Sequence, residues 1–363
     1  MTNYSAPLKD MSFLLNHVAD SRGFDQIEHF SDYDTALVSA VLGEASKFAG
    51  EVLSPLNQSG DVEGCHFNDG AVTTPQGWID AYQQFCDNGW LGLALPEEYG
   101  GQSLPRFIAA AVHEMWLSAN LSFVMFQALT QGAAEILLTA RDDRLKQRYL
   151  EKLVTGEWAT CMSLTEPGAG SDLGNIRTRA VLQADGTYLI RGQKIYITYG
   201  EHDLTKNIVH LVLAKTPDSP PGAKGVSLFI VPKYKVGESG QCGELNDVRC
   251  VSIEHKTGLH GSPTCSISYG DEGGATGELV GAENRGLEYM FILMNEDRLS
   301  TGQQGVAIGE MGYQRALEYS LERTQGRDAL TGETNGLIAR HPDVKRMLMG
   351  LRAQVTALRA FSY

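Results

Sequence analysis

The stretch Met162-Ser163-Leu164-Thr165-Glu166-Pro167-Gly168-Ala169-Gly170-Ser171-Asp172 is the most informative part of this sequence. A strand is expected to end there, and a loop of small residues begins. Gly168 and Gly170 allow backbone N–H groups to approach a ligand closely, and Ser171 adds a hydroxyl donor. The composition therefore favours a loop that binds an anionic or strongly polar ligand such as a pyrophosphate. An ordinary glycine-rich turn is the alternative, because the Rossmann and Walker A fingerprints are both incomplete.

A second informative stretch, Lys194-Ile195-Tyr196-Ile197-Thr198-Tyr199-Gly200, follows at strand-like spacing. Side chains alternate between the two faces of a strand, which places Tyr196 and Thr198 on the same face. An aromatic ring beside a hydroxyl can stack on a flat heterocycle and hydrogen-bond to it. A core strand of a β-sheet is the alternative that this pattern alone favours.

The two stretches lie in a β-rich segment, residues 158–280, between two helical ones. An Asp185-Gly186 pair between 180–183 and 188–191 indicates a hairpin. Further strands are expected at 208–214, 226–231, 250–254 and 264–269. We therefore expect an α+β protein with a helical domain over 1–157, a β-domain over 158–280 and the start of a helical bundle over 281–363.

Apolar residues at helical spacing predict the flanking helices. In the first segment we expect a helix over 34–52 that ends before Pro55, a short helix over 78–88, and one or two buried helices over 105–140. Helical spacing returns at 289–326, and Pro342 is typical of a helix start. The last helix has one predicted apolar face, formed by Val344, Met347, Leu348, Leu351, Val355, Leu358 and Phe361.

Composition narrows the classes of protein that fit. The 363 residues carry 30 Lys+Arg and 44 Asp+Glu, a formal charge of −14, which argues against nucleic acid as the main partner. No apolar run approaches the roughly 18 residues of a membrane span. The six cysteines include no CxxC pair, which favours reduced thiols in a cytoplasmic protein. The nine histidines form no ligand pattern, so we expect no metal site.

Taken together, the two stretches resemble the acyl-CoA dehydrogenase flavoprotein family. The order of helices, β-domain and helices matches as well. The finer pattern is similar to the 3-methylmercaptopropionyl-CoA dehydrogenase branch. The segments that carry these resemblances, beside 164–172 and 196–198, are 4–13, 96–101, 200–204, 246–250, 255–264 and 302–307.

The resemblance implies FAD, bound between the β-domain and the C-terminal helices. Leu164 and Thr165 would meet the pyrimidine edge of the flavin, and Tyr196 and Thr198 would meet its ring near N5. Ser171 would lie where FAD and the pantetheine arm of coenzyme A approach each other. The implied set also includes, by motif position, Met162, Gly170, an arginine beside the acyl pocket at Arg298, and an arginine that reaches a neighbouring subunit's cofactor at Arg323. The segment after Arg323 departs from the family's pattern.

The resemblance also implies a reaction. A carboxylate removes a proton next to the thioester carbonyl of an acyl-CoA, while the β-carbon delivers hydride to the flavin. The product is a 2-enoyl-CoA, and an electron-transfer flavoprotein receives the electrons. The acyl group would be 3-methylmercaptopropionyl or a fatty acyl chain. The resemblance further implies a homo-oligomer.

The resemblance implies two different positions for the catalytic base. In most of the family, this branch included, the base is a glutamate located after the position of Tyr363. A minority of the family has it just before the arginine matched by Arg298, which makes Asp297 and Glu296 the candidates here. The alternative for these two acids is that they complement the dipole at the start of a helix.

Two broader alternatives remain open from the sequence. One is a flavoprotein of the same fold with other chemistry, such as a nitroalkane oxidase or a DNA-binding alkylation-response homologue. The other is an inactive fragment. The helix over 344–363 lacks a C-cap residue after it. Because the resemblance implies further helices, we expect a C-terminally truncated chain that is unstable or poorly active alone.

Overall fold

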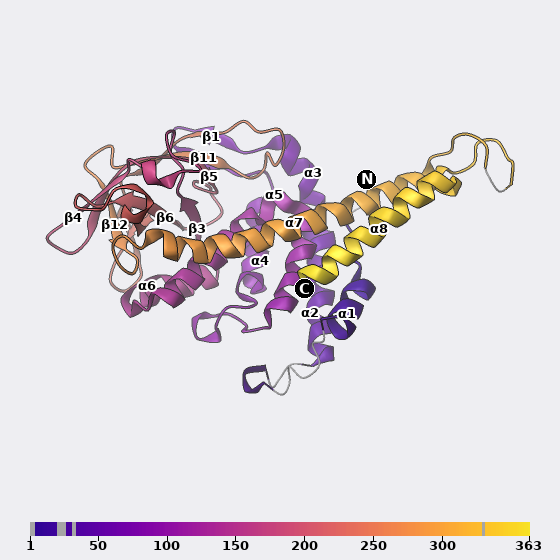
Figure 1. The fold of residues 1–363 in the computed structure, drawn as a ribbon, viewed down its shortest axis with the longest axis horizontal. Helices are drawn as coiled ribbons and strands as arrows, with labels where there is room; N and C mark the ends of the chain where they lie inside the picture. Colours follow the sequence, from indigo (N-terminus) through magenta and orange to yellow (C-terminus); the bar gives the residue numbers. More distant parts are fainter. Residues whose placement is uncertain (1–3, 20–26, 31–33, 329–330) are drawn as a thin grey trace. The chain divides into compact units, whose positions relative to one another are not determined.

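The computed structural model describes residues 4–19, 27–30, 34–328 and 331–363 (Figure 1). The chain divides into two compact units. The first contains residues 1–57, 104–121 and 299–363, and the second contains residues 58–103 and 122–298. Each unit is described by itself below. The α+β class and the order of helices, β-domain and helices are confirmed.

The β-rich part of the second unit contains a closed ring of strands. The main sheet runs in the order β10 (Val248–Ile253), β11 (Thr264–Tyr269), β5 (Tyr188–Thr198), β12 (Ala275–Leu279), β7 (Val226–Pro232), β6 (Asn207–Lys215) and β3 (Trp158–Ser163). β4 (Arg179–Leu182) pairs with both β5 and β6, which closes the path from β5 through β12, β7 and β6. The sheet is therefore barrel-like, as expected.

Local sequence explains the pairings in this sheet. The predicted hairpin is β4 and β5, with Gly186 at φ 87° in the turn and Thr187 donating to Asp185. β6 and β7 are mostly apolar and are buried along their whole length, as is typical of strands covered on both faces. Two small hairpins accompany the main sheet. They are β1 (His66–Asn68) with β2 (Ala71–Thr73), and β8 (Tyr234–Val236) with β9 (Cys242–Leu245).

Helices complete the second unit. α4 (Trp78–Asp87) lies where a short helix was predicted, and α6 (Asp143–Val154) is capped by the Asp142 side chain, which accepts hydrogen bonds from two backbone N–H groups. The second half of α5 (Arg106–Ala140) and the start of α7 (Gly286–Glu322) also belong to this unit. Both supply residues to one apolar core, in which Leu137 and Leu293 are buried with Leu164.

The first unit consists of helices. They are α1 (Leu8–His17), α2 (Thr35–Lys47), the first half of α5, the second half of α7, and α8 (Pro342–Ser362), while α3 (Ser54–Glu63) begins in this unit. Figure 1 shows α8 running back along the second half of α7, after the loop that follows Glu322. α5 is broken at Asn120, where φ is −157° and ψ is 86°, so the expected one or two helices are two segments of one element.

One prediction for these helices is wrong. The helix that begins after Asp34 does not end before Pro55, because a π-helical segment (Phe48–Leu53) leads directly into α3. The wider π turn makes room for the proline ring, which clashes with a carbonyl in a regular α-helix. The predicted apolar face of α8 is only partly covered within this chain. Val355 is buried, but Met347, Leu358 and Phe361 are exposed, and the buried position near the end is Arg359.

α5 also qualifies the expectation about apolar runs. Among the described residues it is the one helix whose length and composition would allow it to cross a membrane. However, 72% of its most apolar window is buried inside the protein. Its composition is therefore explained by its place in the core.

Candidate functional site

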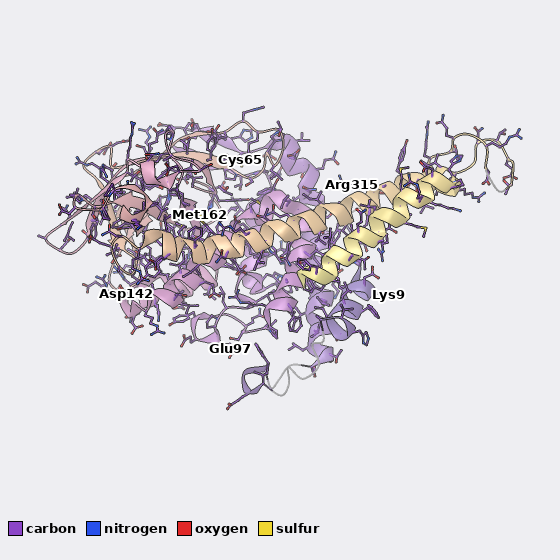
Figure 2. The ribbon with its side chains drawn as sticks, in the orientation of Figure 1. Lys9, Cys65, Glu97, Asp142, Met162 and Arg315 are labelled. Atoms are coloured by element: carbon purple, nitrogen blue, oxygen red, sulfur yellow. The ribbon has the colours of Figure 1, made fainter. Side chains whose placement is uncertain are left out.

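The loop that follows β3 lies at the surface of the second unit. Met162, labelled in Figure 2, lies on β3, which ends at Ser163. Backbone hydrogen bonds of 2.9 and 3.0 Å between residues 166 and 169 then close a tight turn. A Cβ atom placed on Gly168 would meet nothing within 4 Å, and one on Gly170 would meet only the Thr165 methyl group at 3.9 Å. Gly170 and Ser171 are exposed, so the loop leaves space for a ligand to approach its backbone.

β5 holds Tyr196 in an unusual conformation. The register with β11 shifts between Lys194 and Ile197, which is a β-bulge, and Tyr196 has a φ of 61°. Ile197 is buried, whereas Tyr196 is 60% exposed and Thr198 is half-buried. The alternative of a core position for Tyr196 is therefore wrong, and a shared face for Tyr196 and Thr198 stays a prediction. A left-handed backbone is costly for a bulky side chain, and such strain is concentrated at ligand sites.

Hydrogen bonds join the loop to the strand. The Ile195 N–H donates to the Thr165 carbonyl at 2.9 Å. The Lys194 amino group donates to the Leu164 carbonyl and to Glu166 Oε1, both at 2.9 Å. The structure thus brings together Leu164, Thr165 and the strand that carries Tyr196 and Thr198.

The charges behind the loop are buried and paired. Lys194 is fully buried, and Glu166 is nearly so. Burial lowers the pKa of Lys194 to about 8, although Glu166 opposes that shift. Burial alone would raise the pKa of Glu166, but Lys194, Thr178 and Arg177 outweigh it and hold that pKa below its usual range. Both groups are therefore charged near pH 7.

The two acidic candidates lie on α7. This helix begins at Gly286, so Glu296 and Asp297 are about three turns from its start. The helix-dipole alternative is therefore wrong, because that effect is confined to the first turn. Asp297 is half-buried, and burial raises its pKa above the usual range, with Arg298 opposing the shift. A raised pKa suits a carboxylate that accepts a proton at neutral pH, because a general base works best when its pKa is near the operating pH.

The side chains of the two arginine candidates contact residues close to them in the sequence. Arg298 is exposed, donates to Asn295 Oδ1 at 3.0 Å, and its guanidinium lies over the Phe291 ring at 5.3 Å. Arg323 belongs to the first unit, where it directly follows α7, and it donates to Gln325 Oε1 at 2.8 Å. Both side chains are on the surface of their own units, so each is accessible to a ligand.

Sequence reasoning assigned no function to Lys194, Glu166 or Thr178. Lys194 and Glu166 lie within the two motifs, and Thr178 lies outside them. Strand alternation places Lys194 on the same face as Tyr196 and Thr198, so the sequence contained no signal for its burial. The partner itself could not be found, because 28 residues separate it from Lys194 in the sequence.

Comparisons with known proteins decide the family. The N-terminal domain of acyl-CoA dehydrogenase matches residues 38–157, and the middle domain matches residues 161–271. The chain belongs to the acyl-CoA dehydrogenase family. The resemblance stated from the sequence motifs is confirmed, and the motif 162–172 lies at the start of the matched middle domain. Because members of this family are FAD-dependent, FAD is the cofactor that this site has to fit.

Curated acyl-CoA dehydrogenases are similar over nearly the whole chain. The 3-methylmercaptopropionyl-CoA dehydrogenase of Ruegeria pomeroyi is 46% identical over 99% of this chain. A butyryl-CoA dehydrogenase of Syntrophomonas wolfei is 37% identical, also over 99%. The chain spans 61% of the length of each of these relatives.

The fold is also that of a solved acyl-CoA dehydrogenase. Butyryl-CoA dehydrogenase from Megasphaera elsdenii superposes with a TM-score of 0.74 at 21% identity. The match covers 91% of this chain and 79% of that one. It confirms the arrangement of a helical domain, a barrel-like β-domain and C-terminal helices.

The residues present fit FAD. An isoalloxazine ring is flat and aromatic. Tyr196 offers an exposed aromatic ring on a backbone held in the left-handed conformation. Thr198, two residues later on β5, is half-buried and supplies a hydroxyl. The open loop at Gly168 and Gly170 admits a polar chain such as a pyrophosphate beside Ser171.

Proposed function

We propose that this chain binds FAD and takes part in the α,β-dehydrogenation of an acyl-CoA thioester. The observation that carries the proposal is the union of the open loop 162–172 with the strained, exposed Tyr196 on β5. Membership of the acyl-CoA dehydrogenase family supports the reaction class. The proposal concerns the protein that contains this chain, which spans part of the length of its relatives.

The residues divide the work of this reaction. When bound, FAD supplies the hydride acceptor. Tyr196 and Thr198 orient the ring, and the Leu164–Thr165 backbone holds its edge. Ser171 lies on the exposed loop, where it can contact FAD and the pantetheine arm. The proton next to the thioester carbonyl passes to a carboxylate, for which Asp297 is the candidate whose pKa burial has raised.

The names of the relatives suggest the substrate class. They support 3-methylmercaptopropionyl-CoA or a short fatty acyl-CoA as the substrate. We further propose that an electron-transfer flavoprotein accepts the electrons and that the protein is a homo-oligomer. The oligomer is supported by the match of Arg323 to an arginine that reaches a neighbouring subunit. Light scattering of the FAD-loaded protein tests it, and a monomer would contradict it.

Replacing Tyr196 with glycine separates FAD binding from folding. Glycine relieves the left-handed strain, so the apo protein should gain about 0.5–1 kcal/mol of unfolding free energy. Loss of stacking should raise the Kd for FAD about tenfold. Equilibrium unfolding and FAD titration measure the two effects. The conservative Tyr196→Phe variant should keep FAD affinity within a few-fold. Unchanged FAD affinity in the glycine variant would contradict the stacking role.

Replacing Asp297 with asparagine tests the base. If Asp297 accepts the proton, the rate at which acyl-CoA reduces the flavin should fall about 10²–10⁴-fold, because general base catalysis has that range. Stopped-flow absorbance measures the rate. Glu296→Gln is the matched control, since Glu296 is the neighbouring acid. Unchanged reduction in the Asp297→Asn protein would remove Asp297 from the role, and a loss only in Glu296→Gln would transfer it to Glu296.

A further inference from the structure

A buried amino group lies directly behind the candidate flavin loop. Lys194 is on β5, two residues before the exposed Tyr196, and its side chain is completely inaccessible to solvent. Its Nζ atom donates to the Leu164 carbonyl and to Glu166 Oε1, both at 2.9 Å. A buried ammonium group is strongly unfavourable unless it is paired and hydrogen-bonded, so these two contacts are required for its place.

The carboxylate that pairs with Lys194 is itself fully hydrogen-bonded. Glu166 Oε1 also accepts from the Thr178 hydroxyl at 2.6 Å and from the Thr178 N–H at 3.1 Å. Glu166 Oε2 accepts from the Arg177 N–H at 2.6 Å. Charge-assisted hydrogen bonds of this kind are about twice as strong as neutral ones. The carboxylate therefore fixes the loop to the segment that leads into β4.

These contacts join three segments of the chain around the loop. They are the backbone of 164–166, the 177–178 segment and β5. The neighbouring hydrogen bond from Ile195 N–H to the Thr165 carbonyl strengthens the link. Both carbonyl groups of the Leu164–Thr165 pair are thereby held against β5. The Leu164 carbonyl is held by the ion-paired Lys194, and the Thr165 carbonyl by the backbone of β5.

We propose that Lys194 and Glu166 are positioning residues that hold the Leu164–Thr165 backbone and Tyr196 in one fixed geometry for the cofactor. The proposal rests on the proposed function, because it assumes that FAD is the ligand of this loop. Neither residue is proposed to touch FAD or substrate. Preorganisation of this kind lowers the ordering cost that the ligand would otherwise have to offset.

The test compares variants of the full chain in FAD titrations and, without FAD, in hydrogen–deuterium exchange of peptides over 162–178. Lys194→Met should raise the Kd for FAD at least tenfold and should speed exchange in the apo loop. Lys194→Arg keeps the charge and should recover part of both. Thr178→Val removes one donor to Glu166 and, as the milder variant, should raise the Kd about threefold if Lys194→Met fails to fold.

A second buried ion pair provides the matched control. Arg148 and Glu278 are 9% and 13% exposed, lie in the same unit, and have no described hydrogen bond to 162–172. Arg148→Met should lower stability but leave the Kd for FAD within twofold.

Three results are decisive. Equal loss of FAD affinity in Arg148→Met would show that Lys194 acts through general stability, which overturns the proposal. A parent protein that binds FAD, with unchanged affinity and unchanged loop exchange in Lys194→Met, would overturn it as well. A parent that binds no FAD would instead refute the proposed function. In that case the exchange of the apo loop still decides whether the ion pair holds it.

Discussion

Replacing Arg359 with methionine is expected to lower the free energy of unfolding by about 3–5 kcal/mol. Arg359 is fully buried in the first unit, between Glu114 and Glu310, which are each 1% exposed. Its Nε and Nη2 atoms donate to the two carboxylates at 2.7 Å, and the Tyr363 hydroxyl also donates to Glu114. Without the guanidinium, two carboxylates remain buried without a cation. Urea unfolding measures the change.

A surface arginine of the same helix is the control for this effect. Arg346 pairs with Asp343 at 2.9 Å, and both side chains are 73% exposed. Arg346→Met should therefore change the free energy of unfolding by less than about 1 kcal/mol. Adding Glu114→Gln and Glu310→Gln to the Arg359→Met variant should restore part of the loss, because the unpaired charges are removed. A loss in Arg359→Met as small as that in Arg346→Met would contradict the account.

Replacing Gly192 with alanine is expected to destabilise the protein by about 2–4 kcal/mol and to weaken FAD binding. Gly192 lies in β5, and a Cβ atom there would overlap the Thr178 hydroxyl and lie 2.8 Å from the Thr178 Cα atom. Thr178 must move, and its hydrogen bonds to Glu166 are then lost. The change therefore reaches the ion pair behind the flavin loop without altering a charged residue.

Gly186→Ala is the control that introduces backbone strain without a steric overlap. Gly186 has a φ of 87°, and a Cβ atom there would meet nothing within 4 Å. Gly186→Ala should therefore cost only about 1 kcal/mol, the penalty of a left-handed backbone. It should leave FAD affinity unchanged. Urea unfolding and FAD titration of both variants provide the comparison, and equal effects in the two would show that the overlap with Thr178 is unimportant.

Much of the fold was predictable because its signals are local. The hairpin before Gly192 follows from one Asp-Gly pair, and the start of α8 follows from Pro342. Where the prediction was wrong, non-local contacts decided the outcome. The expected helix end before Pro55 was prevented by a π turn. The burial of Arg359 in α8 was likewise not predictable, because its partners Glu114 and Glu310 lie on other helices.

The candidate site shows the same division. Thr165, Tyr196 and Thr198 were predicted from motif and alternation, and the structure brings their segments together. The β-bulge that exposes Tyr196 could not be predicted, because it depends on the register between β5 and β11. The pairing of Lys194 with Glu166 depends on how the chain returns to the loop. The position of Asp297 within α7 depended on where that helix begins.

The proposed function is that this chain binds FAD and takes part in the dehydrogenation of an acyl-CoA. Anaerobic titration with acyl-CoA thioesters of the FAD-loaded protein that contains this chain, following oxidised-flavin absorbance, tests this function. The panel would contain 3-methylmercaptopropionyl-CoA, butyryl-CoA and longer saturated thioesters, with dithionite as the control for reducibility. The proposed function requires that at least one thioester bleaches the flavin and yields the 2-enoyl-CoA. Bound FAD that dithionite reduces, but that no thioester reduces, would contradict it.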